Sequence, residues 1–180
     1  MIGVAAAFAG CHRPAKTLTG SPAPSAAPIN ACGLLTSTEI AAVQGESIRD
    51  AVPSNQPGAG MATSQCYFAT PTANKSVVLT LWQRINNTTR SPREFWDERF
   101  HGTGSKSGGE DEEQGERLRQ SLVPVPNLGD EAFWSGTNVG GALYVRKGDR
   151  FFRVAVGGAD EKDAKIKRSK ALAEAILKRL

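Results

Sequence analysis

The hydrophobic pattern of the chain first predicts β-strands before residue 90. Residues 65–69, QCYFA, form a short run of strand-favouring residues, and residues 76–85, SVVLTLWQRI, alternate between two faces. The residues PTAN between them are enough for a hairpin turn. Residues 50–63 contain two prolines and two glycines, so we expect a loop there.

A second group of strand patterns lies after residue 130. We expect strands at 131–136 (EAFWSG), 141–148 (GALYVRKG) and 150–158 (RFFRVAVGG). The last two are separated by a tight turn centred on Gly148 and Asp149. Consecutive strands joined by short turns favour antiparallel pairing.

Two segments carry the start signals of helices. In TSTEIAAVQG, Thr36 and Glu39 have the spacing of a capping box, and Gly45 is a natural end. In SPREFW, Ser91 and Glu94 have the same spacing, with a proline in the first helical position. Each segment is therefore expected to begin a helix.

A third helix is expected over residues 160–180, where apolar residues recur at helical spacing. The order of the elements is then α-ββ-α-βββ-α. Runs of antiparallel strands interrupted by helices are typical of the α+β class. The sequence predicts a single twisted antiparallel sheet of about five to seven strands, with helices packed on one face.

The N-terminus changes this picture. The order Phe8-Ala9-Gly10-Cys11 resembles a bacterial lipobox, in which a peptidase cuts before a cysteine that carries a diacylglyceryl group. The resemblance implies a signal peptide over residues 1–10 and lipidation of Cys11, although no Lys or Arg precedes the apolar run. The alternative is a soluble protein with an apolar start and a chance cysteine.

The next segment has the composition of a spacer. Residues 11–30 are dominated by Pro, Ala, Ser and Thr and have no apolar periodicity. We expect a disordered tether that holds a lipid-anchored domain clear of the membrane. The domain organisation is then a signal peptide at 1–10, a tether at 11–30 and one α+β domain at 31–180.

The other two cysteines are Cys32 and Cys66. If Cys11 is lipidated, these two can form one disulfide, which suits an oxidising compartment. The bridge would join the start of the first helical region to a strand. The alternative is a pair of buried free thiols.

Charge adds one candidate surface. The net charge of +4 is mild and does not by itself indicate nucleic acid. Positive residues are concentrated in the tether and in the last helix, where Lys165, Arg168 and Lys170 form a possible patch for an anionic surface or partner. The alternative is that basic residues late in the helix complement its dipole.

No catalytic chemistry is predicted. The chain has two histidines and lacks a G-x-S-x-G turn and a G-x-G-x-x-G fingerprint, so we expect no enzyme, cofactor or dedicated metal site. Residues 110–116 are strongly acidic, and a solvated loop is favoured over a cation site because the spacing is not that of an EF-hand. A hydrolase remains the least favoured interpretation.

Two short motifs resemble a group of small bacterial envelope lipoproteins of unknown function. The first motif is Cys-x-Leu-Leu-Thr before the first helix, and the second is Gly-Asp-x-Ala before the last hairpin. The resemblance implies a disulfide, an α+β fold and a lipid anchor, and it implies no activity. The matching residues here are Cys32, Leu34, Leu35, Thr36 and Glu39 in the first motif, and Gly129, Asp130 and Ala132 in the second.

Together these patterns predict a lipid-anchored protein of the cell envelope, on the periplasmic or extracellular side of a membrane. Its expected role is non-enzymatic binding of an envelope protein or an anionic polymer. The alternative is a carrier of a small hydrophobic ligand or peptide, with a pocket between the sheet and the helices. The many aromatic residues leave room for a partly exposed aromatic sheet face.

Overall fold

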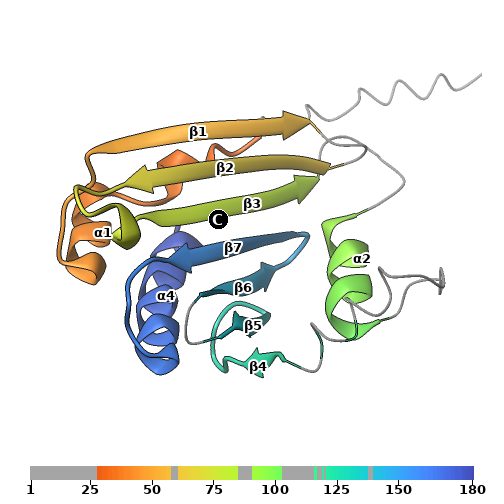
Figure 1. Ribbon diagram of the computed structural model, residues 1–180. Coiled ribbons are helices and arrows are strands. Elements are labelled where there is room, and N and C mark those ends of the chain that lie inside the picture. Colours follow the sequence, from red (N-terminus) through yellow and green to blue (C-terminus); the bar gives the residue numbers. More distant parts are fainter. Residues whose placement is uncertain are drawn as a thin grey trace, which may run out of the picture.

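The architecture is a single open antiparallel sheet with helices on both faces (Figure 1). Within the described residues, seven strands follow one another across the sheet in the order β1-β2-β3-β7-β6-β5-β4. The computed structural model describes residues 28–57, 61–84, 91–102, 116, 119, 121–137 and 140–180.

The strands form two groups that meet at the β3–β7 pair. All neighbours pair antiparallel, and at this central pair Val77 lies opposite Val156. The hairpin between β6 and β7 turns at Gly148 and Asp149, as the sequence predicts. The strands are β1 (Asp50–Pro57), β2 (Met61–Ala69), β3 (Val77–Arg84), β4 (Val123–Pro124), β5 (Glu131–Gly136), β6 (Gly141–Lys147) and β7 (Arg150–Val156).

The helical segments begin where their caps predict. Thr36 and Glu39 make both hydrogen bonds of a capping box at the start of α1, which ends at Gly45 with a φ of 74°. Ser91 and Glu94 do the same for α2. The segments are the 3₁₀ turn η1 (Ala31–Leu34), α1 (Ser37–Gln44), the 3₁₀ turn η2 (Ala73–Lys75), α2 (Pro92–Trp96), the π-helical turn η3 (Asp97–His101) and α4 (Lys162–Leu177).

The predicted α+β class and single antiparallel sheet are confirmed, and each group of strands has one member more than expected. The stretch expected as a loop at 50–63 contains β1, an edge strand with proline at positions 53 and 57. Proline is tolerated at a sheet edge because the outer side of an edge strand needs no ladder hydrogen bonds. The second extra strand is the two-residue β4.

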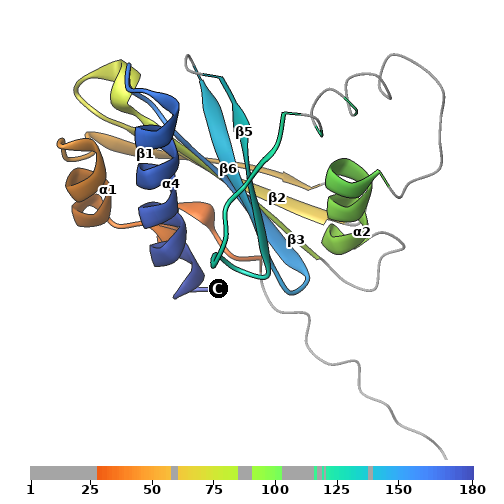
Figure 2. The ribbon, with the colours of Figure 1, turned by 90° about the horizontal axis from the view of Figure 1, so that it is seen from below.

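The two faces of the sheet are covered unequally. Figure 2 shows α1 and α4 on one side of the sheet and α2 on the other. Phe151 and Phe152 are neighbours on β7 and therefore point to opposite faces, yet both are buried. Phe152 belongs to the main core, whereas Phe151 packs with Trp96 of α2 in a separate aromatic cluster. The helices thus do not all pack on one face, because α2 has its own core on the opposite one.

We call the side covered by η1, α1 and α4 the first face and the side that carries α2 the second face. None of the helices in the described part of the chain is both long enough and apolar enough to cross a membrane.

Candidate functional site

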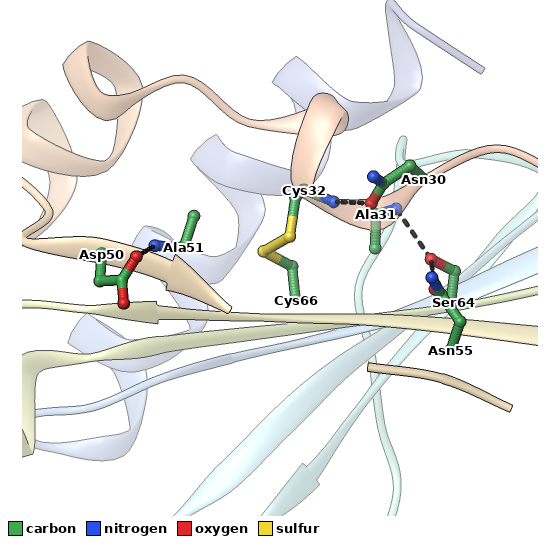
Figure 3. Close-up of a disulfide and its surroundings, with 8 residues drawn as sticks. All are labelled: Asn30, Ala31, Cys32, Asp50, Ala51, Asn55, Ser64 and Cys66. Carbon is green, nitrogen blue, oxygen red and sulfur yellow. Dashed lines mark hydrogen bonds between the residues drawn. A yellow bond between two sulfur atoms is a disulfide. The ribbon is translucent and has the colours of Figure 1, made fainter. Parts of the chain in front are cut away.

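A disulfide fastens the start of the domain to the first face of the sheet (Figure 3). Cys32 in η1 is bonded to Cys66 in β2, with the two Cα atoms 5.0 Å apart. Beside the bridge, the backbone N–H of Ala31 donates to Ser64 Oγ at 3.0 Å. The predicted pairing of Cys32 with Cys66 is confirmed.

The folded region starts slightly before the predicted boundary at residue 31. The side chain of Gln83 receives a hydrogen bond from the Ile29 N–H at 2.9 Å and donates one to the Ile29 carbonyl at 3.0 Å. Ile29 and Asn30, which the composition assigns to the tether, are therefore held against the domain. Cys11 and the proposed signal peptide lie outside the described residues.

The basic residues singled out on the last helix do not form one exposed patch. Lys165 is only 2% exposed and lies on the buried side of α4. Arg168 donates to Gln44 Oε1 at 3.0 Å and pairs with Asp160, so it ties α4 to α1. Lys170 is half-buried. The sequence alone does not show which side of an amphipathic helix a charged residue occupies. The expectation of one exposed basic patch on this helix is therefore wrong.

No described helix covers the second face over β1, β2 and the Val78 end of β3, whereas Trp82 at the other end of β3 packs with the α2 cluster. Among the described residues, the exposed large hydrophobic side chains are Val52 at 47% and Tyr67 at 40%. They lie opposite each other in the β1–β2 pair, and the next two strands continue the row with Val78 and Ala155. The sheet therefore presents an apolar row, Val52–Tyr67–Val78–Ala155, that no described helix covers.

An open hollow of about 390 Å³ adjoins this row. Val78 and Ala155 belong to both, and Asn74 and Ser76 line the side next to η2. The remaining lining comes from residues 140–141 and 156–159, which are mostly glycine. A side chain at Gly157 would collide with the carbonyl oxygen of Asn74, so glycine there lets β7 end close against η2.

Positive charge lies beside the hollow. The guanidinium carbons of Arg99 and Arg153 each lie 6.0 Å from the ring centroid of Tyr144. Within the described ranges, neither guanidinium makes an ion pair or hydrogen bond. Arg153 and Ala155 are two residues apart on β7 and point to the same face, so Arg153 lies beside the mouth of the hollow.

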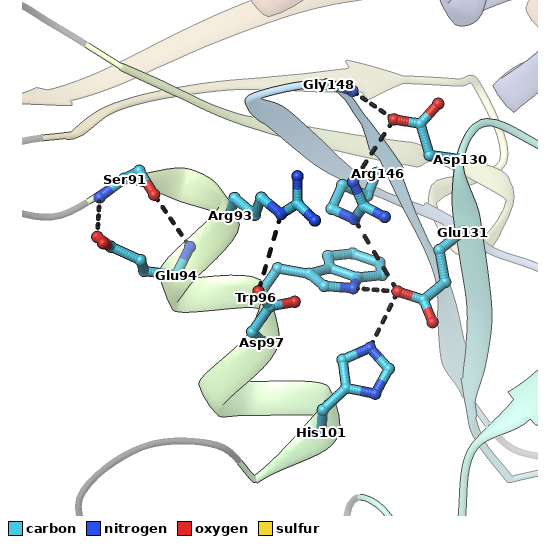
Figure 4. A network of polar contacts seen from close by, with 10 residues as sticks. All are labelled: Ser91, Arg93, Glu94, Trp96, Asp97, His101, Asp130, Glu131, Arg146 and Gly148. Carbon is cyan, nitrogen blue, oxygen red and sulfur yellow. Dashed lines mark hydrogen bonds and ion pairs between the residues drawn. The ribbon is translucent and has the colours of Figure 1, made fainter.

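One carboxylate holds α2 and η3 against this face (Figure 4). Glu131 Oε2 receives a hydrogen bond from Trp96 Nε1 at 2.7 Å and lies 3.0 Å from His101 Nε2. The ring of Trp96 is fully buried and packs against Phe100 and Phe151 with centroids 4.2 and 5.7 Å apart. His101, which the sequence does not single out for a binding role, thus helps to hold η3, the segment that carries Arg99, against the second face.

A second carboxylate fastens η2, which lines one side of the hollow through Asn74. Glu46 accepts hydrogen bonds from the Thr72 hydroxyl at 2.7 Å and the Thr72 N–H at 3.0 Å, and it pairs with Lys75 at 2.9 Å. The hydrogen bond from the Thr72 hydroxyl, followed by those from Lys75 and the Thr72 N–H, lowers the pKa of Glu46 from its ordinary value of 4.5 to about 2.

Lowering the pH should therefore reduce the free energy of unfolding more steeply for wild type than for Glu46→Gln. A carboxyl whose pKa is lower in the folded protein stabilises it fully above about pH 4.5, and this contribution is lost as the pH falls toward 2. The stability difference between the two proteins should be constant above about pH 5 and shrink below it. Urea unfolding at a series of pH values measures this. Glu174→Gln, on the exposed side of α4, is the control, and identical profiles for all three proteins would contradict the expectation.

The described residues offer no group of three or more His, Cys, Asp or Glu side chains arranged to hold a metal ion. Apart from Glu116, the acidic run at 110–116 lies outside the described part of the chain. What the second face offers is an apolar row, a hollow and two guanidinium groups, a combination suited to noncovalent binding.

Comparison of the chain with protein-family models, with curated proteins and with solved structures finds no match.

Proposed function

We propose that this chain is a lipid-anchored protein of the cell envelope whose domain binds a partner or ligand through the bare part of the second face. The observation that carries the proposal is the apolar row Val52–Tyr67–Val78–Ala155 beside an open hollow, with Val52 and Tyr67 exposed and Val78 and Ala155 half-buried. Soluble domains bury most of their large apolar side chains. An apolar row that stays open at the surface is therefore a feature of binding sites.

The cysteines support the location. The pairing of Cys32 with Cys66 leaves Cys11 outside the disulfide. Disulfides persist mainly in oxidising compartments outside the cytoplasm. A lipid on Cys11 and a spacer up to residue 28 would place the domain near a membrane surface.

The location is tested by the intact mass of the protein extracted from the membrane fraction of its own host. A chain that begins at Cys11, carries the mass of a diacylglyceryl group and lacks two hydrogens is expected. An unprocessed chain with three free thiols would overturn both the anchor and the compartment.

Binding through the second face is tested with a photoreactive amino acid placed at Tyr67 in the living host. The matched control places the same amino acid at Glu174, which is exposed on α4. Adducts of defined mass are expected from Tyr67 and not from Glu174, and Val52→Glu should reduce them because it puts a charge in the row. Equal labelling from both positions would contradict the proposal.

The second candidate is a carrier of a small ligand, which the hollow of about 390 Å³ favours because small-molecule pockets have volumes of a few hundred Å³. This hollow lies on the open sheet face and beside η2, whereas the sequence suggests a pocket between sheet and helices. The least favoured alternative is a hydrolase.

A further inference from the structure

We propose that the second face binds an anionic amphiphile with a single alkyl chain. Its phosphate or carboxylate would lie between Arg99 and Arg153, and its chain would lie on the row Val52–Tyr67–Val78–Ala155. This inference rests on the proposed binding function and names the class of ligand.

The charged end is argued from the environment of Tyr144. Both guanidinium carbons lie 6.0 Å from its ring centroid, so the two positive charges of this face gather around one side chain. Several other arginine side chains of the fold, Arg84 and Arg179 among them, have carboxylate partners. Guanidinium groups bind phosphate and carboxylate oxygens through paired N–H donors. In the described ranges the pair at Tyr144 lacks such a partner, so it is available to an anionic ligand.

The apolar end is argued from the strand register. Ala155 lies two residues beyond Arg153 on the same face and begins the row that crosses β3 and β2 to Val52. Three steps between neighbouring strands span about 14 Å, which an extended decyl chain matches in length. The hollow at Val78 and Ala155 gives the first part of that chain a concave wall.

The edge of the sheet argues against an added peptide strand as the occupant. β1 is the edge strand on this side, and Pro53 and Pro57 lack the backbone N–H that strand addition would use. Prolines at an edge are a common protection against such pairing. An alkyl chain needs no backbone donors from β1.

The test is calorimetric titration of the full, disulfide-bonded chain with decyl phosphate below its micelle concentration. We expect saturable one-to-one binding, with amide shifts at Gly140, Gly157 and Gly158 in the NMR spectrum. Arg153→Gln and Arg99→Gln should each raise the dissociation constant by about tenfold or more, because each removes a charged hydrogen-bond donor. Arg93→Gln changes an exposed arginine on α2, the helix directly before η3 and Arg99; it is the matched control and should bind as wild type does. Thermal melting shows whether each variant is folded.

Three further measurements separate the contribution of the alkyl chain from that of the charged group. Tyr67→Ser should weaken decyl phosphate several-fold and leave any binding of inorganic phosphate unchanged. The proposal of an amphiphilic ligand would be contradicted if inorganic phosphate bound as tightly as decyl phosphate. The proposal of an anionic ligand would be contradicted if decyltrimethylammonium bound as tightly as decyl phosphate. Absence of decyl phosphate binding, or binding that ignores both arginine variants, would overturn the inference. In that case specific adducts at Tyr67 would still support the proposed binding function. If those adducts were also absent, both the ligand class and the proposed function would be contradicted.

Discussion

Protein with the Cys32–Cys66 bridge is expected to melt about 10 °C above the Cys32→Ala, Cys66→Ala double variant. The bridge closes a loop with a sequence separation of 34. Restricting such a loop in the unfolded chain stabilises the folded state by about 4 kcal/mol on the chain-entropy model. Cys66 is fully buried, so alanine there also leaves a small space in the core.

Thermal and urea unfolding of both proteins, with and without reductant, measure this effect. Reductant should lower the melting temperature of wild type toward that of the double variant and leave the variant unchanged. Cys11→Ser, outside the disulfide, is the control and should retain the full stability. A wild-type melting temperature that reductant does not move would show that the bridge contributes little.

Replacing Trp96 with alanine should cost about 4 kcal/mol, the range for a fully buried tryptophan. Its ring is 0% exposed and contacts Phe100, Phe133 and Phe151. The substitution also leaves Glu131 without its 2.7 Å donor. Because α2 runs directly into η3, which carries Arg99 of the proposed site, the variant should lose decyl phosphate binding as well as stability.

Trp96→Phe separates the two causes. It keeps a six-membered ring in the cluster and removes the N–H donor to Glu131 with the rest of the indole, so a smaller loss of about 1–2 kcal/mol is expected. Urea unfolding followed by circular dichroism measures both variants, and Arg93→Ala on the exposed side of α2 is the control. Equal stability of Trp96→Ala and wild type would mean that the second aromatic cluster does not hold α2 in place.

The sequence predicts local structure well where one residue type has one structural role. The capping boxes at Thr36 and Ser91 give the starts of α1 and α2 because only a few side chains can accept the first free N–H groups of a helix. The Gly148–Asp149 turn is likewise local. The cysteine pair was predictable by count, since Cys32 and Cys66 remain once Cys11 is set aside.

What the sequence does not reveal is which side of an element is covered. The polar strand β1 resembles a loop because its strand character comes from pairing with β2. The cluster around Phe151 could not be separated from the core around Phe152, since the two residues are adjacent and equally apolar. Lys165 is buried against expectation for the same reason.

The Cys-x-Leu-Leu-Thr and Gly-Asp-x-Ala motifs have structural roles in this fold. In the first, Cys32 forms the bridge and Thr36 with Glu39 caps α1. In the second, Asp130 receives a hydrogen bond from the N–H of Gly148 at 2.7 Å, which lowers the pKa of Asp130 and ties β5 to the β6–β7 turn. None of these residues belongs to the row Val52–Tyr67–Val78–Ala155. The motifs therefore contribute to the stability of the fold, and they do not indicate where the proposed binding site lies.

The bridge between η1 and β2 has a mechanical consequence. A pull on the N-terminal segment reaches the domain at Ile29 and then at the Cys32–Cys66 bond. A pulling force can extend only the residues before Cys32, because those between Cys32 and Cys66 are closed into a covalent loop. Load therefore passes directly into β2, inside the sheet, and the edge strand β1 is not peeled away. A domain held to a surface by its N-terminus could thus withstand a tug on a bound ligand without unravelling from that end.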